Sequence, residues 1–166
     1  MNHQVNNVFL ASRSDYFRVL LTQKFKTDSR KKIEVKSVWT QFWKEIDHYI
    51  MTGELSLNQY DLRYILKFLK EANYFLLDDL VDACVRTFMP EYLSDFTCID
   101  LYLFSQKYFI ETLKQLSLDF MMYRSGWLMD NEVFEHRWNL IIREDDKEEL
   151  KKEIKQRESK YFINKH

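Results

Sequence analysis

Histidine and cysteine are the residue types of this chain best suited to metal binding or nucleophilic attack, and their spacing supports neither. A structural zinc site takes four ligands, usually in closely spaced pairs, and no histidine here has a cysteine or second histidine at such a spacing. Both cysteines lie in helix-like apolar segments without a paired histidine and acid to activate a thiol. We therefore expect them to be small core residues. The residues concerned are His3, His48, His136, His166, Cys84 and Cys98.

The positions of the carboxylates and glycines also fit structural roles better than catalytic ones. Asp78 and Asp79, like the acids at 145–146, stand where helices are predicted to begin, and negative charge stabilises that end of a helix. The only two glycines, Gly53 and Gly126, are too few for a phosphate-binding loop. The sequence therefore predicts no catalytic residue, no cofactor and no metal.

The composition favours a compact helical protein. Of 166 residues, 16% are aromatic, whereas only two are glycine and one is proline, which argues against an all-β fold. No run of about 18 apolar residues is present, so we expect no membrane span. Two cysteines do not make a disulfide framework, and the net charge of -1 gives no general attraction to nucleic acid. An intracellular location, cytoplasmic or nuclear, is therefore expected.

Apolar residues recur every three or four positions in three segments, which predicts three amphipathic helices. These segments are residues 39–50, 62–72 and 77–88. Gly53 supplies a stop for the first helix, and Pro90 is expected to close the third. A shorter helix is predicted after Ser14, around residues 15–21, and one strand at residues 33–35.

The tail at residues 143–160 carries seven acidic and seven basic residues, with a thin apolar seam that includes Leu150 and Ile154. Its acids cluster early and its bases late, which suits the helix dipole. We interpret the tail as a solvated helical extension, with a short coiled coil formed with a partner as the alternative. Pairs four residues apart are expected within it, namely Glu148 with Lys152 and Glu153 with Arg157.

The order of these elements resembles the BTB/POZ domain. In that family a Leu-Ala-x-x-Ser-x-Tyr-Phe segment precedes a strand, a helix and a Tyr-Thr-Gly-like turn, and the family often has a cysteine in its last helix. The matching residues here are Leu10, Ala11, Ser14, Tyr16, Phe17, Met51, Thr52, Gly53 and Cys84. The resemblance implies a mostly α (α+β) fold over residues 1–89, in which BTB/POZ-like helical hairpins pack beside a small sheet. It also implies a protein-interaction module that is not an enzyme.

A second resemblance begins after Pro90. Residues 94–123 read as two short helices and residues 131–142 as a third, which is similar to the opening of the BACK region that follows BTB in Kelch-type adaptors. This implies a partial BACK-like helical region at residues 90–142, followed by the charged helical tail at 143–166. No Kelch repeats follow in this sequence.

The chain departs from the BTB pattern at its beginning. The family usually starts with a two-strand hairpin, and only seven residues precede Val8 here, so we expect that hairpin to be lacking. The strand at 33–35 then loses its sheet neighbours and leaves an edge open to another chain. The N-terminal region is accordingly expected to be poorly ordered or to be completed by a second molecule.

The resemblance also implies a partner site. Family members that bind a cullin ubiquitin-ligase scaffold commonly show a hydrophobic-x-Glu motif, which falls here on Phe25 and Thr27, with Asp28 one place later. The apolar anchor is present and the glutamate is replaced. Met51, where the family often has tyrosine, is the second candidate cullin contact and an adaptable one. A core role at the end of a helix is the alternative for Phe25.

Three functions follow for testing. The first is a non-enzymatic protein–protein interaction adaptor, with the role of substrate adaptor of a cullin-based ubiquitin ligase as its specific form. The second is an oligomerisation partner or decoy that pairs with full-length BTB chains, or with itself as a homodimer, without cullin binding. The third is nucleic-acid binding through the basic segment at residues 24–36, which a solvated loop explains better.

Overall fold

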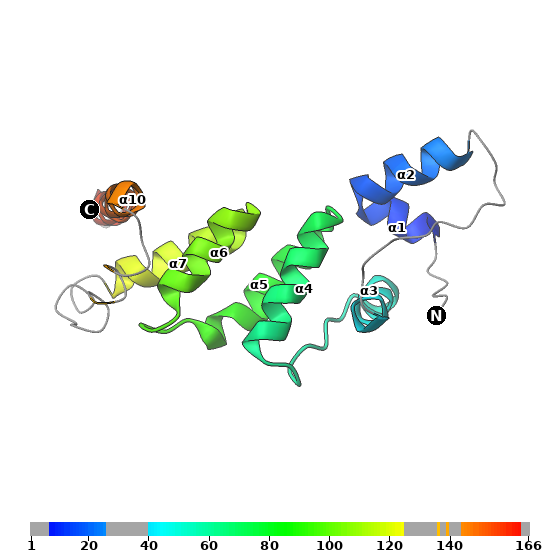
Figure 1. The fold of residues 1–166 in the computed structure, drawn as a ribbon, viewed down its shortest axis with the longest axis horizontal. Coiled ribbons are helices and arrows are strands. Elements are labelled where there is room, and N and C mark those ends of the chain that lie inside the picture. Colours follow the sequence, from blue (N-terminus) through cyan, green and yellow to red (C-terminus); the bar gives the residue numbers. More distant parts are fainter. Residues whose placement is uncertain (1–6, 26–39, 125–135, 137–138, 140–143, 164–166) are drawn as a thin grey trace. The chain divides into compact units, whose positions relative to one another are not determined.

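The computed structural model describes residues 7–25, 40–124, 136, 139 and 144–163. This part of the chain contains eight helices and no strand (Figure 1), so the prediction of a mostly helical protein is confirmed. The strand expected at residues 33–35 lies outside the described residues, as do nearly all residues of the helix expected at 131–142. The chain divides into two compact units, Met1–Phe88 and Met89–His166.

The first unit is built from helices that follow the predicted apolar periodicities. Phe42, Ile46 and Ile50 form the buried face of the third helix. The helices are α1 (Asn7–Arg13), α2 (Asp15–Phe25), α3 (Thr40–Thr52), α4 (Leu62–Tyr74) and α5 (Asp78–Tyr92), the last of which continues past the end of the unit.

Helix α4 shows how the local sequence sets both ends of a helix. At its start the side chain of Asp61 accepts a hydrogen bond from the backbone N–H of Tyr64 at 2.8 Å, which satisfies one of the free donors of the first turn. At its end the N–H of Leu77 donates to the carbonyl oxygen of Ala72 at 3.1 Å. Leu76, directly before Leu77, adopts a left-handed backbone with φ of 50°, a conformation that glycine usually supplies.

Helix α5 corrects the expectation that Pro90 ends it. The apolar stripe predicted here is buried as expected, with Cys84 and Val85 fully enclosed, but the helix continues through Pro90 to Tyr92. Proline removes its own N–H from the hydrogen-bond ladder and its ring crowds the carbonyl four residues earlier, but here it stands in the last turn of the helix. The backbone hydrogen bonds continue after Pro90, because the N–H of Leu93 donates to the carbonyl oxygen of Met89 at 3.1 Å.

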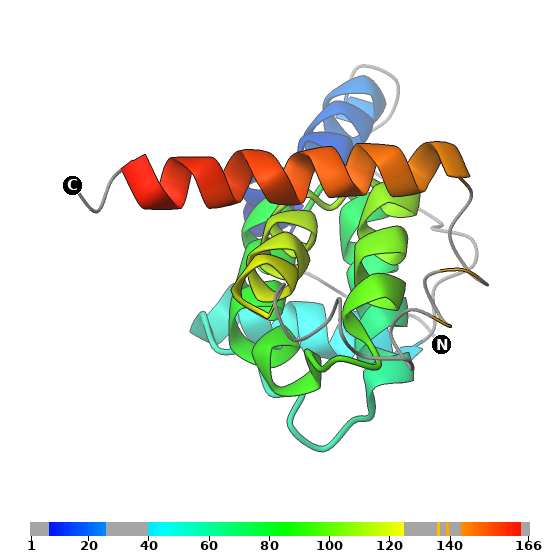
Figure 2. The same cartoon turned by 90° about the vertical axis from the view of Figure 1, so that its left-hand side faces the viewer.

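The second unit holds α6 (Cys98–Tyr108), α7 (Glu111–Tyr123) and α10 (Glu144–Ile163). In Figure 2, α10 (orange to red) runs across α6 and α7 (yellow-green). One apolar cluster joins the three helices. Its buried members are Cys98, Ile99, Tyr102, Leu118, Met121, Leu150 and Ile154.

The interpretation of the charged tail as a solvated extension is wrong. Leu150 is 0% exposed and Ile154 5% exposed, both within the core of the second unit. Of the two pairs expected within the helix, that of Glu153 with Arg157 is wrong, because Glu153 pairs with Lys114 and Arg157 with Asp119, both of α7. Glu148 does pair within the helix, with Lys151 at 3.2 Å. Two aliphatic side chains four residues apart are enough for docking when neighbouring helices supply the rest of the apolar surface and the opposite charges.

Candidate partner-binding site

The end of α3 presents Met51 to solvent on a well-defined turn. Gly53 takes a left-handed backbone with φ of 75°, and its N–H donates to the carbonyl oxygen of Tyr49 at 2.8 Å. The hydroxyl of Thr52 donates to the carbonyl oxygen of His48 at 2.7 Å and accepts from the N–H of Glu54 at 3.0 Å. The helix is therefore closed by its own sequence. Met51 remains 64% exposed, an apolar and adaptable contact surface.

The other candidate cullin contacts lie at and beyond the end of α2. Phe25 is the last residue of this helix, whereas Thr27 and Asp28 lie outside the described residues, as does the side chain of Phe25. The structure thus places Phe25 at the end of α2 and Met51, exposed, in the last turn of α3. The grouping of all four residues into one site remains a prediction.

The corner between α1 and α2 explains the motif that begins the family resemblance. Leu10 and Phe17 are buried, with 6% and 3% of their surface exposed. Ser14, between the two helices, donates a hydrogen bond to the carbonyl oxygen of Phe75 at 2.5 Å and accepts one from the N–H of Phe17 at 3.2 Å. Nearby, Arg13 and Asp79 form an ion pair at 3.3 Å. The motif therefore fixes the start of α2.

An aromatic cluster holds α2 in place beside α3 and the end of α4. The rings of Phe17 and Phe75 stack with centroids 5.3 Å apart and 20° between their planes, and Trp43 lies 5.8 Å from Phe17 and 5.5 Å from Phe75. Tyr16 and Phe42 extend the cluster to either side. Such pairs add about 0.5–1.5 kcal/mol each beyond area burial. The helix that ends at Phe25 consequently has a rigid base.

A buried carboxylate forms a polar site that the sequence patterns did not indicate. Glu45, 7% exposed, accepts hydrogen bonds at Oε1 from Gln41 at 2.9 Å and from the hydroxyl of Tyr60 at 3.1 Å. The ring of Tyr60 stacks on that of Tyr64 with centroids 3.7 Å apart. Burial, followed by the hydrogen bond with Tyr60, raises the pKa of Tyr64. Glu45 lies on the same buried face of α3 as Phe42 and Ile46. An acidic residue type on this apolar face was the only sequence signal for the polar site.

The two cysteines are packed as small core residues, as predicted. Cys84 and Cys98 are each 0% exposed. Burial raises the pKa of the Cys84 thiol to about 12 and that of Cys98 to about 11. Because the thiolate is the reactive form of cysteine, both side chains are poor nucleophiles at neutral pH.

The described residues show no group of three or more histidine, cysteine or acidic side chains placed to hold a metal ion. His48 is exposed on α3. Of the basic segment at 24–36, only Lys24 and Phe25 belong to the described part of the chain, where they end α2. Within that same part, no helix combines the length and apolar character needed to cross a membrane.

Comparison with known proteins places the first unit in context. A family model of the BTB/POZ domain matches residues 2–90. The chain is 26% identical to Kelch-like protein 38 of Danio rerio over 106 residues, which make up 64% of this chain and 18% of that protein. It is 23% identical to Kelch-like protein 6 of Homo sapiens over 129 residues, or 78% of this chain and 20% of that protein.

A viral relative shows the same extent of similarity. Kelch repeat and BTB domain-containing protein 1 of Vaccinia virus (strain Copenhagen) is 22% identical over 131 residues, which cover 79% of this chain and 22% of that protein. The chain thus spans about a fifth of the length of these curated relatives. Stretches of 129 and 131 residues are longer than the domain match, so the similarity extends beyond the first unit.

Proposed function

The chain belongs to the BTB/POZ domain family, and from this premise we propose that it is a non-enzymatic protein–protein interaction adaptor that contacts a cullin scaffold. BTB/POZ domains mediate protein–protein interaction and dimerisation, and they are typically non-catalytic. In this proposal the adaptor contacts the scaffold through Phe25 and Met51, with Thr27 and Asp28 beside them.

The exposed Met51 is the observation that carries the proposal. It stands in the last turn of α3, in the position where the family often has tyrosine before Thr-Gly, and it is 64% exposed. Hydrogen bonds of Thr52 and Gly53 close the helix directly after it. An apolar anchor that a partner buries can act as an interface hot spot of roughly 2 kcal/mol or more. Phe25, at the end of the helix fixed by the aromatic cluster, supplies the second anchor.

We further propose the domain scheme to which this site belongs. Residues 1–89 form a BTB/POZ-like domain, residues 90–142 a partial BACK-like helical region, and residues 143–166 the charged helical tail. The small sheet around residues 33–35 belongs to the first domain. The similarity to Kelch-like proteins beyond residue 90 supports the BACK assignment.

Calorimetric titration of the full 166-residue chain with the N-terminal domain of a cullin tests the adaptor role. We expect micromolar or tighter binding that weakens by roughly tenfold or more in Phe25→Ala and in Met51→Ala. Leu76→Ala is the matched control, because Leu76 is an exposed apolar residue of the same unit in a different turn. Absence of binding by a folded sample, or equal losses in all three variants, would contradict the proposal.

A second candidate function is favoured by Thr27, which stands where the cullin-binding motif has glutamate. An oligomerisation partner or decoy for BTB chains uses the dimerisation ability of the family without the scaffold contact. Light scattering of the chain alone, and after mixing with a full-length Kelch-like protein, distinguishes the two. Oligomers that persist in Phe25→Ala, together with no heat of binding to the cullin domain in calorimetry, would establish the second function in place of the first.

A further inference from the structure

Helix α10 is attached to its unit by few apolar side chains. Although the helix has 20 residues, the apolar side chains of its described part that reach the core are Leu150 and Ile154. Helix α7, with 13 residues, buries Leu113, Leu118 and Met121. The attachment of α10 therefore combines these two apolar side chains with polar contacts to α6 and α7.

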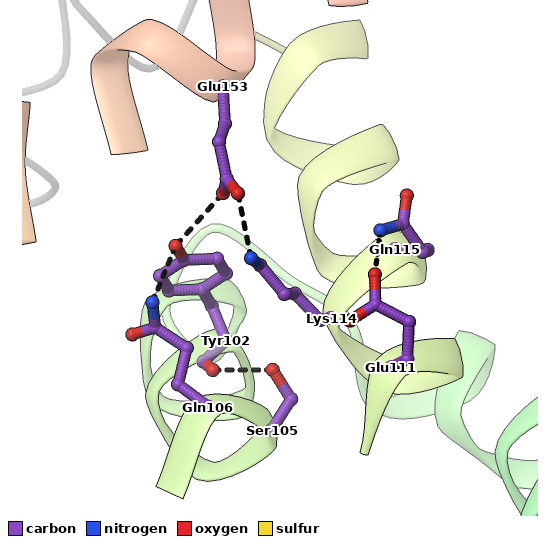
Figure 3. Close-up of polar contacts among 7 residues, drawn as sticks. All are labelled: Tyr102, Ser105, Gln106, Glu111, Lys114, Gln115 and Glu153. Carbon is purple, nitrogen blue, oxygen red and sulfur yellow. Dashed lines mark hydrogen bonds and ion pairs between the residues drawn. The ribbon is translucent and has the colours of Figure 1, made fainter. Parts of the chain in front are cut away.

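One carboxylate of α10 bridges both helices beneath it. Glu153 Oε2 accepts a hydrogen bond from the hydroxyl of Tyr102 on α6 at 3.0 Å, and Glu153 Oε1 accepts one from Nζ of Lys114 on α7 at 2.7 Å (Figure 3). The side-chain amide of Gln106 donates to the Tyr102 hydroxyl at 2.9 Å and so orients it toward the carboxylate. Tyr102, Lys114 and Glu153 thus connect α10 to both α6 and α7.

A second ion pair lies one turn further along the helix, between Arg157 and Asp119 of α7. The side chains of Lys114 and Glu153 retain 20% and 25% exposure, and Asp119 retains 60%. Charged pairs that still contact water are screened by salt and contribute modestly to stability. The polar half of the α10 attachment is therefore sensitive to ionic conditions.

The face under α10 has the features of a helix-binding groove. It combines an apolar floor from two helices with donors at Tyr102 and Lys114 and an acceptor at Asp119. A complementary helix needs two aliphatic side chains four residues apart, a carboxylate directly before the second and an arginine three residues after it. Amphipathic helices are commonly bound in such grooves by anchors at this spacing. In α10 the residues are Leu150, Glu153, Ile154 and Arg157.

We propose that the α6–α7 face is a helix-binding groove, which α10 fills as a displaceable internal ligand, and that a partner helix with the same spacing takes its place. The chain itself defines the chemistry of that partner, because α10 shows which side chains the groove accepts. When the partner helix replaces α10, the apolar surface of α6 and α7 stays covered.

The test uses the full chain and a labelled synthetic peptide of residues 144–163, with binding followed by fluorescence anisotropy. Glu153→Ala combined with Arg157→Ala breaks the polar contacts of the internal helix and leaves its core residues intact. We expect the peptide to bind this variant at least tenfold more tightly than the wild-type chain, because the internal competitor is weakened. A peptide that carries the same two substitutions should lose binding.

Glu148→Ala combined with Lys152→Ala is the matched control, since both residues are exposed on α10 and Glu148 pairs within the helix, with Lys151. This variant should bind the peptide as weakly as the wild type. Equal affinity for all three chains, or no binding to any of them while circular dichroism shows native helix content, would overturn the proposal.

Hydrogen exchange of the wild-type chain gives a second measurement that requires no variant. We expect the amides of residues 147–157 to exchange at least tenfold faster than those of residues 98–108, and the difference to grow with salt. Equal protection of both segments would mean that α10 opens only when the whole unit unfolds, and this too would overturn the proposal.

Discussion

The hydroxyl of Ser14, at the corner between α1 and α2, donates a hydrogen bond to the carbonyl oxygen of Phe75 at the end of α4, 2.5 Å away and 61 residues later in the chain. Both residues are almost fully buried, at 2% and 1% exposure. The same hydroxyl accepts a hydrogen bond from the N–H of Phe17. One side chain thus starts α2 and fastens it to α4.

Ser14→Ala should lower the free energy of unfolding of the first unit by about 1–3 kcal/mol, because it leaves the buried carbonyl of Phe75 without its donor. Urea denaturation followed by tryptophan fluorescence and circular dichroism measures the change. Ser56→Ala, at an exposed loop position, should stay within about 0.5 kcal/mol of the wild type. Superimposable curves for the two variants would show that the hydrogen bond contributes nothing.

Tyr60→Phe should destabilise the first unit by about 1.5–3 kcal/mol, since it removes a donor to the buried carboxylate of Glu45 and hydrogen bonds to charged groups are the stronger ones. Tyr49→Phe is the matched control. Its hydroxyl makes an exposed hydrogen bond of 3.4 Å to the carbonyl oxygen of Asp79, so we expect a change below about 0.5 kcal/mol. The prediction fails if the urea midpoints of the two variants coincide.

Phe109→Gly should stabilise the second unit. Phe109 closes α6 in a left-handed backbone with φ of 56° and is 89% exposed, so its side chain loses little burial on removal. The left-handed conformation costs an L-residue about 1–2 kcal/mol, and the greater freedom of glycine in the unfolded chain offsets about 0.5–1 kcal/mol of that. A net gain of about 0.5–1 kcal/mol follows.

Thermal unfolding of both Phe109→Gly and Phe109→Ala distinguishes the effect of relieving backbone strain from the effect of removing the exposed ring. Alanine keeps the Cβ atom and hence the strain, so only the glycine variant should show a higher midpoint. A similar rise for both variants would assign the gain to removal of an exposed ring.

Stability should fall as the pH rises from about 9 toward 12. The pKa of Cys84 is raised by burial from 9.0 to about 12, and that of Cys98 from 9.0 to about 11. Above about pH 9 the unfolded chain loses thiol protons that the folded chain retains, and unfolding becomes easier in this window. Urea midpoints at several pH values measure the slope, and Cys84→Ala should make it shallower in spite of its own packing cost. An unchanged slope in Cys84→Ala would contradict this origin.

Thiol labelling with an aromatic disulfide reagent at pH 8 gives an independent check on the cysteines. We expect both thiols to react slowly in the folded chain and rapidly in denaturant, because the thiolate is scarce and the side chains are enclosed. Rapid labelling of one thiol per native chain would refute the prediction for Cys84 or Cys98, and Cys98→Ala identifies which.

The helices could be predicted from the sequence because their signals are local. Apolar residues at three- and four-residue steps marked α3, α4 and α5, and Gly53 marked the end of α3 through its own backbone preference. Pro90 misled for the same local reason, since one missing N–H near the end of a helix does not stop it when the next hydrogen bond forms.

Contacts between distant segments could not be predicted in this way. Ser14 and Phe75 are 61 residues apart, and Tyr102 and Glu153 are 51 apart, so no periodicity connects them. The tail looked solvated because most of its own residues are charged, and the apolar surface that receives Leu150 and Ile154 belongs to other helices. Of the candidate site, the exposure of Met51 follows from the turn, whereas the grouping with Phe25, Thr27 and Asp28 stays a prediction.

The position of α10 in the chain also sets an order for folding during synthesis. The first unit ends at Phe88, whereas the core of the second unit is complete only once Ile154 has been made. At about 5–20 residues per second, roughly 3–13 s of translation separate the two positions. In the later part of that interval, from Tyr123 at the end of α7 until Ile154, α6 and α7 are complete and their apolar face is uncovered, so the nascent chain is most prone to aggregation, and most accessible to a chaperone, just before its last helix emerges.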